Sequence, residues 1–145
     1  MKICYLANTS IPSTNASAIQ IVKTCEILSK LKQKVLLITT NVSDENFFYD
    51  YDVKYKFNVI KLKKFIKFPL GLKYYLFSIC SVLKSFKFKP DFYITRNFFT
   101  CFLLTLFKKK TILELHHDLN MESRIVKFLV KNTNFLNFSS LIKLI

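Results

Sequence analysis

The order of elements predicted at the start of the chain constrains the fold more than any other feature. Lys2–Ala7 is an apolar run typical of a strand, Ala16–Lys32 carries apolar residues at helical spacing, and Lys34–Thr40 predicts a second strand. Strands joined through a helix run parallel, and such βαβ units are right-handed in nearly all cases. We therefore expect a Rossmann-like α/β fold, doubly wound, with a mainly parallel sheet and helices on both faces.

The predicted helix has one apolar face and a polar start. The residues expected to pack on the sheet are Ala18, Ile21, Val22, Cys25 and Leu28. Ser13, Thr14 or Asn15 can cap the first turn through a side-chain oxygen. The preceding loop has no glycine, which the dinucleotide fingerprint requires, so a Rossmann dehydrogenase is not expected. The loop is either an anion site at a helix start or an ordinary capped surface loop.

Two further predicted strands, Asp91–Arg96 and Thr111–Leu115, end in polar residues. Arg96 closes the first, and Glu-Leu-His-His-Asp at 114–118 closes the second. Ligands of open α/β sheets bind outside the carboxyl ends of the strands. We therefore expect Arg96, Glu114 and His116 to border one site, although a structural histidine bonded to nearby backbone remains the alternative for His116.

The remaining segments complete the prediction. Residues 41–55 are polar and acidic and indicate an excursion over the surface. The other expected elements are a weak strand at 57–62, helices at 70–86, 98–107 and 120–135, and a short strand at 136–139.

The net charge of +14 suggests an anionic partner, but the composition offers a second explanation. Nearly all the positive charge is lysine, and Lys, Phe, Ile and Asn dominate the chain, as an AT-rich genome would produce. Arginine, which binds phosphate better as a planar fork, occurs only at Arg96 and Arg124.

Lysines alternate with aromatic residues between the weak strand and the following helix. The segment at 61–69 reads Lys-Leu-Lys-Lys-Phe-Ile-Lys-Phe-Pro. Lys61, Lys63, Lys64 and Lys67 are therefore candidate contacts with an anionic membrane surface. A solvated lysine face over core phenylalanines is the competing interpretation. Nucleic acid is not expected as a partner, because no recognition motif accompanies the charge.

The sequence indicates neither a metal site nor a catalytic nucleophile. His116 and His117 would point to opposite faces of a strand, which makes a poor metal site, and no further ligand cluster is present. The cysteines, which form no Cys-x-x-Cys pair, are Cys4, Cys25, Cys80 and Cys101. Their apolar surroundings indicate reduced core thiols in a cytoplasmic protein.

In their order, these motifs resemble the N-terminal domain of family 4 glycosyltransferases, enzymes with the two-domain GT-B fold. The matching segments cover nearly the whole chain: MKICYLA, SIPSTNASAIQIVKTCEILSKL, KVLLIT, DFYITR, ELHHD and NFSS.

The resemblance implies retaining transfer of a sugar from a nucleotide-sugar donor to a glycan or lipid-linked acceptor in cell-surface polysaccharide synthesis. It implies no cofactor and usually no metal. His116 takes the catalytic role near the donor sugar, while Ser10, Asn15, Arg96 and Glu114 are the substrate-binding candidates. The expected location is the cytoplasm, with peripheral contact at the inner face of the membrane.

Two departures from the family qualify this expectation. Glycine is common between the first helix and second strand, where this chain has Leu-Lys-Gln-Lys at 31–34, so a slightly strained turn is expected. The donor-binding second domain is also missing, so we expect a truncated gene product or one half of a split enzyme that needs a separate C-terminal-domain chain. Alone it should be nearly inactive, because half a cleft positions neither reactant. The alternative is a non-enzymatic Rossmann-like domain that docks on a partner protein.

Overall fold

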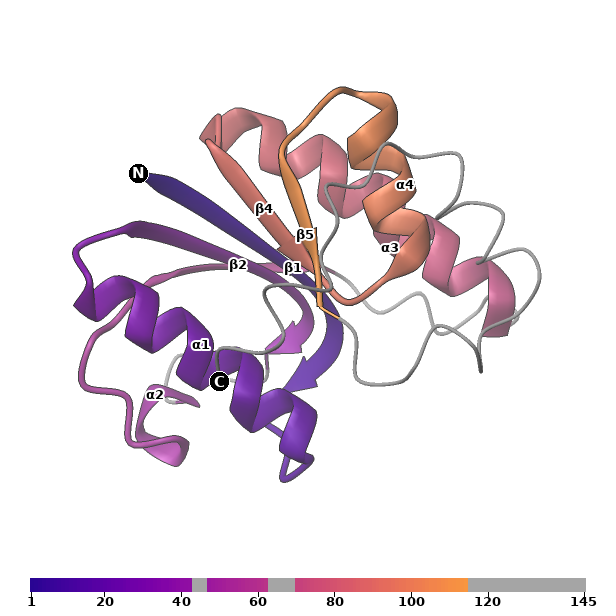
Figure 1. Ribbon diagram of the computed structural model, residues 1–145. Helices are drawn as coiled ribbons and strands as arrows, with labels where there is room; N and C mark the ends of the chain where they lie inside the picture. Colours follow the sequence, from indigo (N-terminus) through magenta and orange to yellow (C-terminus); the bar gives the residue numbers. More distant parts are fainter. Residues whose placement is uncertain (43–46, 63–69, 115–145) are drawn as a thin grey trace. The chain divides into compact units, whose positions relative to one another are not determined.

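The computed structural model describes residues 1–42, 47–62 and 70–114 (Figure 1). Strands and helices alternate along most of this part of the chain. The strands are β1 (Lys2–Ile11), β2 (Lys34–Val42), β3 (Asn58–Leu62), β4 (Phe92–Thr95) and β5 (Thr111–Leu113). The helices are α1 (Ala16–Lys30), α2 (Phe47–Asp50), α3 (Leu70–Ser85), the 3₁₀ turn η1 (Phe86–Phe88) and α4 (Phe98–Leu106).

All strand pairs in the described part of the chain are parallel, and the sheet order is β3-β2-β1-β4-β5. The chain builds outward from β1 to β3 and then returns to the other side of β1 to add β4 and β5. Neighbours β1 and β4 therefore mark the point where the winding direction reverses, which is where open α/β sheets bind ligands.

Helices cover both faces of the sheet, as Figure 1 shows with α1 on one side and α3 and α4 on the other. Tyr5 and Leu37 belong to the buried cluster beneath α1, whereas Leu6 and Ile38 belong to the cluster beneath α3 and α4. Because successive strand residues face opposite sides, both faces need apolar residues, and the central strands read as continuous apolar runs. The predicted doubly wound α/β fold is confirmed.

Helix α1 lies on the sheet through the predicted stripe. Ala18, Ile21, Val22 and Cys25 are fully buried, and Leu28 packs against them. Asn15 is the N-cap residue, but its side chain makes no capping hydrogen bond. The Ser13 side chain instead accepts a hydrogen bond from the Asn15 N–H at 3.2 Å.

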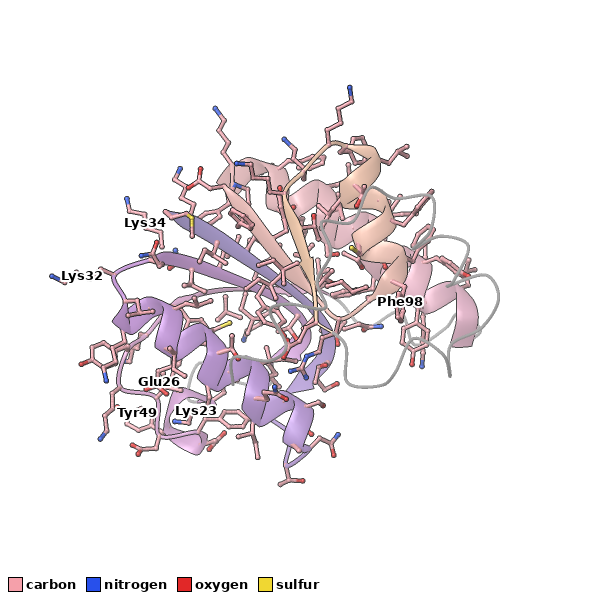
Figure 2. All side chains as sticks on the ribbon, viewed as in Figure 1. Lys23, Glu26, Lys32, Lys34, Tyr49 and Phe98 are labelled. Atoms are coloured by element: carbon pink, nitrogen blue, oxygen red, sulfur yellow. The ribbon has the colours of Figure 1, made fainter. Side chains whose placement is uncertain are left out.

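The turn after α1 has the strain expected from its missing glycine. Lys32 adopts φ 59°, in the left-handed region that glycine normally occupies. Its N–H donates to the Ser29 carbonyl at 2.9 Å, and the Gln33 N–H donates to the Leu28 carbonyl at 3.1 Å. This pair of bonds defines a Schellman motif, from which Lys32 projects at the end of α1 (Figure 2).

The predicted surface excursion at 41–55 is wrong for its second half. Phe47 is buried, and Phe48, Tyr51 and Val53 pack against the cluster beneath α1. The short helix α2 gives these side chains their inward direction, and its single turn is too brief to produce a recognisable helical period.

Most other boundaries differ from the prediction by one or two residues. Strand β1 is the exception: it was predicted to end at Ala7 but reaches Ile11, so Ser10 belongs to the strand and not to the loop. Strand β5 ends at Leu113, one residue before Glu114. The predicted helix at 120–135 and strand at 136–139 lie outside the described residues.

Candidate functional site

The carboxyl ends of β4 and β5 lie side by side, because Thr95 pairs with Leu113 in the parallel ladder. The Glu114 N–H extends this ladder by donating to the Thr95 carbonyl at 2.9 Å. Arg96 and Glu114 therefore leave the sheet at neighbouring positions, next to the reversal point between β1 and β4.

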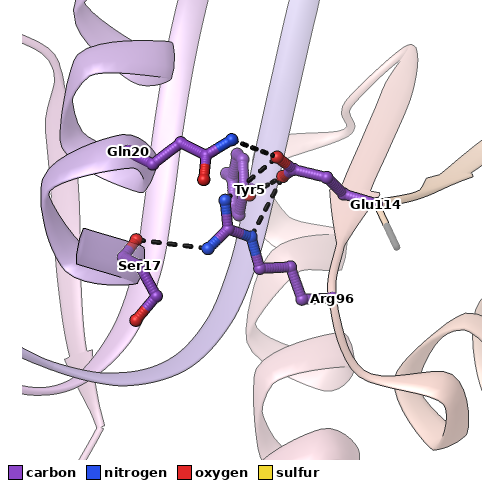
Figure 3. Close-up of polar contacts among 5 residues, drawn as sticks. All are labelled: Tyr5, Ser17, Gln20, Arg96 and Glu114. Atoms are coloured by element: carbon purple, nitrogen blue, oxygen red, sulfur yellow. Dashed lines mark hydrogen bonds and ion pairs between the residues drawn. The ribbon is translucent and has the colours of Figure 1, made fainter. Parts of the chain in front are cut away.

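Arg96 and Glu114 form a two-bond ion pair (Figure 3). Arg96 Nη2 lies 2.9 Å from Glu114 Oε1, and Nε lies 3.1 Å from Oε2. The side chains are only 14% and 25% exposed, so solvent screens the pair weakly. The third contact, from Arg96 Nη1 to the Ser17 carbonyl at 3.2 Å, ties the pair to the first turn of α1.

Two further side chains donate to the same carboxylate (Figure 3). The Tyr5 hydroxyl donates to Glu114 Oε2 from the buried strand β1, and Gln20 Nε2 donates to Oε1 at 3.1 Å from α1. The network therefore joins β1, α1 and the residues that follow β4 and β5. It holds the carboxylate and the guanidinium in one orientation, as a preorganised binding surface requires.

Burial and the Glu114 contacts shift the ionisation of both neighbours. Partial burial is the largest single influence on the pKa of Arg96 and would lower it, but the interactions with Glu114 and Tyr5 together outweigh burial, so the pKa is raised and the guanidinium stays charged. Burial, with the hydrogen bond to Glu114, raises the pKa of Tyr5 far above its usual value. The Tyr5 phenol consequently keeps its proton and acts as a donor at neutral pH.

A partly exposed Arg–Glu pair has the chemistry to recognise a polyhydroxylated ligand. The guanidinium has five N–H donors, of which the contacts with Glu114 and Ser17 use three, so a ligand hydroxyl can accept a hydrogen bond from it. Since both protein side chains are already oriented, they would lose little further conformational freedom when a ligand binds.

The other predicted substrate-binding residues lie near the start of α1 or before it. Ser10 pairs with Thr40 in the ladder between β1 and β2, and Asn15 is exposed at the N-terminus of α1. Asn15 lies two residues before Ser17, whose carbonyl accepts from Arg96. The described contacts bring Arg96 and Glu114 together; they include no side-chain bond from Ser10 or Asn15 to that pair.

Of the remaining predicted residues, only one lies in the described part of the chain. Lys61 is exposed on β3. His116 and the membrane candidates Lys63, Lys64 and Lys67 lie outside the described residues, so their roles stay predictions.

The loop between β1 and α1 is fixed by Tyr51. Its hydroxyl accepts from the Ser13 N–H at 2.6 Å and donates to the Ser13 carbonyl at 2.7 Å. A hollow of about 700 Å³ lies beside this loop. Its lining residues are Pro12, Ser13, Thr14, Ile19, Lys23, Asp50, Tyr51 and Asp52. Its volume lies within the usual range of small-molecule sites.

The four cysteines are free thiols, and Cys4, Cys25 and Cys101 are buried. Burial raises the pKa of the Cys4 and Cys25 thiols strongly and that of Cys101 to about 12. These three thiols remain protonated near neutral pH and are poor nucleophiles. Within residues 1–42, 47–62 and 70–114, no three His, Cys, Asp or Glu side chains converge on a possible metal site.

The sequence did not identify Tyr5, Ser17 and Gln20 as members of the network. Tyr5 carried one weak signal, a hydroxyl in an otherwise apolar predicted strand. Its contact with Glu114 depends on the register that pairs Leu6 with Thr95, which no local pattern specifies. The Ser17 contact uses a backbone carbonyl, and so no side-chain pattern could indicate it.

The fold and this edge of the sheet define a Rossmann-like α/β domain with a polar cluster where such domains bind ligands. No protein-family model and no curated protein matches the chain.

Proposed function

We propose that the chain is the acceptor-side domain of a glycosyltransferase that moves a sugar from a nucleotide-sugar donor to a glycan or lipid-linked acceptor. The observation that carries this proposal is the Arg96–Glu114 pair at the carboxyl edge of a parallel sheet, beside the winding reversal. Both residues are substrate-binding candidates in the resemblance to family 4 glycosyltransferases.

In this proposal, acceptor hydroxyls bind the exposed edge of the pair, while Tyr5 and Gln20 keep the carboxylate in place. His116 keeps the catalytic role that the resemblance gives it, near the donor sugar. A donor-binding domain would supply the groups that hold the nucleotide diphosphate.

A binding experiment on the full chain tests the acceptor assignment. Saturation-transfer NMR would use methyl hexosides and short oligosaccharides as acceptor probes, and UDP and GDP as donor probes. We expect saturation transfer to at least one saccharide and none to the nucleotides. Arg96→Met and Glu114→Gln should weaken the saccharide signal roughly tenfold or more, since each removes a charged hydrogen-bond partner.

The matched control is Lys23→Met, because Lys23 also forms a 2.9 Å ion pair but lies away from the strand ends. This variant should keep the wild-type signal. If no saccharide binds, or if binding survives Arg96→Met unchanged, the acceptor assignment is wrong.

An activity assay tests the need for a donor domain separately. We expect the purified chain alone to transfer no sugar and to leave UDP-glucose and GDP-mannose unhydrolysed. Transfer or donor hydrolysis above background, lost in His116→Ala, would show instead that this chain holds a sufficient active site.

A further inference from the structure

Helix α3 is apolar on two opposite faces. Its inner face packs into the core through Phe77 and Val82, which are fully buried. Its outer face consists of Leu72, Tyr75, Ile79 and Leu83, which are 46%, 48%, 43% and 57% exposed. These four residues follow one another at intervals of three or four, so they form one stripe along the helix. A surface helix normally presents polar residues there.

The apolar surface continues from α3 onto α4. The Tyr75 ring packs edge-on against Phe99 with centroids 4.6 Å apart, and Phe86 packs in the same way against Phe107 at 5.4 Å. Leu106 and Phe107, at the end of α4, are 66% and 49% exposed. The helices α3 and α4 lie together on one side of the sheet in Figure 1.

Positive charge borders this apolar surface, and the sequence segments that form the surface contain almost no negative charge. Residues 53–90 and 92–113 contain no aspartate or glutamate. Six exposed lysines lie in the last turn of α3 or just after α3 and α4. We call them the lysine cluster: Lys84, Lys87, Lys89, Lys108, Lys109 and Lys110. Asp91 lies between the two acid-free segments, and its carboxylate accepts from the Lys2 N–H at 2.7 Å.

We propose that the outer face of α3, together with the lysine cluster, binds the surface of an anionic lipid membrane. A bilayer interface accommodates both features at once, because apolar side chains enter the acyl boundary while lysines remain at the phosphates. Tyrosine also suits this boundary, with an apolar ring and a polar tip. An acidic protein partner would pair the lysines, but its charged surface would leave the aliphatic stripe poorly covered.

This surface is separate from the lysine-aromatic segment at 61–69 that the sequence indicates, and it does not depend on the proposed sugar transfer. Peripheral binding needs no membrane-spanning element. Among the residues that the structure describes, no helix is long and apolar enough to cross a bilayer.

Vesicle co-sedimentation of the full chain tests the proposal. One set of vesicles contains only phosphatidylcholine, and the other contains phosphatidylcholine with phosphatidylglycerol; neither contains a sugar-linked lipid. We expect binding to the anionic set at least tenfold tighter than to the neutral set, and weaker as salt concentration rises.

Two pairs of variants separate this surface from the rest of the molecule. Reversing Lys84, Lys87 and Lys108 to glutamate should weaken binding roughly a hundredfold or more. Reversing Lys30, Lys54 and Lys56 changes the net charge equally. Lys30 ends α1, and Lys54 and Lys56 lie between α2 and β3, so these three lysines should matter much less. Likewise, Ile79→Ser with Leu83→Ser should weaken binding about tenfold. The control is Ile27→Ser with Leu31→Ser, at the same spacing near the end of α1 and similarly exposed.

The proposal fails if neutral and anionic vesicles bind the chain equally, or if neither binds it. It also fails if both lysine triples weaken binding to the same degree, since overall charge would then explain the effect. If the chain does not bind vesicles, light scattering can test a second copy as the partner. A dimer that the Ile79 and Leu83 substitutions abolish would then assign the stripe to self-association instead.

Discussion

Arg96 and Lys23 each place a side-chain nitrogen 2.9 Å from a glutamate oxygen, but their surroundings differ. The Lys23 side chain is 41% exposed, so water competes for its charge, although its partner Glu26 is only 12% exposed. The Arg96 side chain is 14% exposed, and its partner Glu114 also receives bonds from Tyr5 and Gln20. Equal distances therefore correspond to unequal contributions to stability.

Replacing Arg96 should reveal this difference. Arg96→Met leaves the Glu114 carboxylate with less compensation in a mostly buried position, which should lower the free energy of unfolding by about 2 kcal/mol. Lys23→Met should lower it by about 0.5 kcal/mol. Urea unfolding followed by circular dichroism measures both, and equal losses would contradict the role given to burial.

The cysteines allow a test of the core that needs no substitution. Cys4, Cys25 and Cys101 are buried, whereas Cys80 is half-buried. A thiol must be exposed and ionised to react. Burial hides the first three thiols from the reagent, and it also raises their pKa values so that they stay protonated. We expect N-ethylmaleimide at pH 8 to modify Cys80 first, with the other three reacting at the rate of unfolding. Mass spectrometry of quenched samples measures the order, and early modification of Cys25 would contradict the described packing of α1.

At the scale of elements, three helices end in the same motif without the glycine that usually completes it. Lys32, Asp52 and Lys108 have φ values of 59°, 46° and 53° after α1, α2 and α4. At each end, successive N–H groups bond back to the last turn in the Schellman pattern. The chain contains one glycine, Gly71, and it lies within α3 instead. The fold therefore accepts local strain at these turns.

Restoring glycine should stabilise the protein. Lys32→Gly removes the clash between Cβ and the backbone at positive φ, and this outweighs the greater freedom of glycine in the unfolded chain by about 0.5–1 kcal/mol. Lys108→Gly should behave similarly. Lys30→Gly, only two residues earlier in the last turn of α1, should destabilise by up to about 1 kcal/mol. Thermal unfolding compares the three, and a destabilised Lys32→Gly would show that this lysine makes compensating contacts.

The elements themselves were predictable wherever the pattern was long enough to read. The apolar stripe of α1 and the apolar runs of β1 and β2 specified their types, because helical and strand periods differ over several turns. Helix α2 was missed because one turn cannot establish a period. The Lys32 turn was anticipated only through the family resemblance, since nothing in Leu-Lys-Gln-Lys itself indicates positive φ.

At the scale of the whole molecule, the candidate site was predictable in part. The neighbouring positions of Arg96 and Glu114 follow from the parallel βα order, which places both strand ends at one edge of the sheet. Their direct pairing, and the contributions of Tyr5 and Gln20, depend on strand order and register, and these are set by packing across the entire sheet. Local sequence patterns carry no information about such long-range pairs.

The buried phenol and thiols also predict how the stability of the entire molecule depends on alkaline pH. Burial raises the pKa values of Tyr5, Cys4 and Cys25 above their usual values of 10.0 for tyrosine and 9.0 for cysteine. Below about pH 8, the folded and unfolded chains hold these protons almost equally. Above it, the unfolded chain releases them while the folded chain keeps them, so stability should fall as pH rises. This contribution to the free energy of unfolding is fully present at neutral pH. It is lost as the pH rises toward the raised pKa values of the folded chain.

Tyr5→Phe isolates one proton from this effect. The variant cannot ionise at this position, so its free energy of unfolding should fall by about 1 kcal/mol less than wild type between pH 10 and 11. Lysine deprotonation in the same range relieves repulsion, but it does so in wild type and variant alike and cancels from the comparison. Tyr49→Phe is the matched control, because its side chain is 79% exposed and lies in solvent in both states. Urea unfolding at each pH gives the slopes. Parallel curves for wild type and Tyr5→Phe would mean that Tyr5 reaches water in the folded protein, and that the hydroxyl is not held against Glu114 beneath α1.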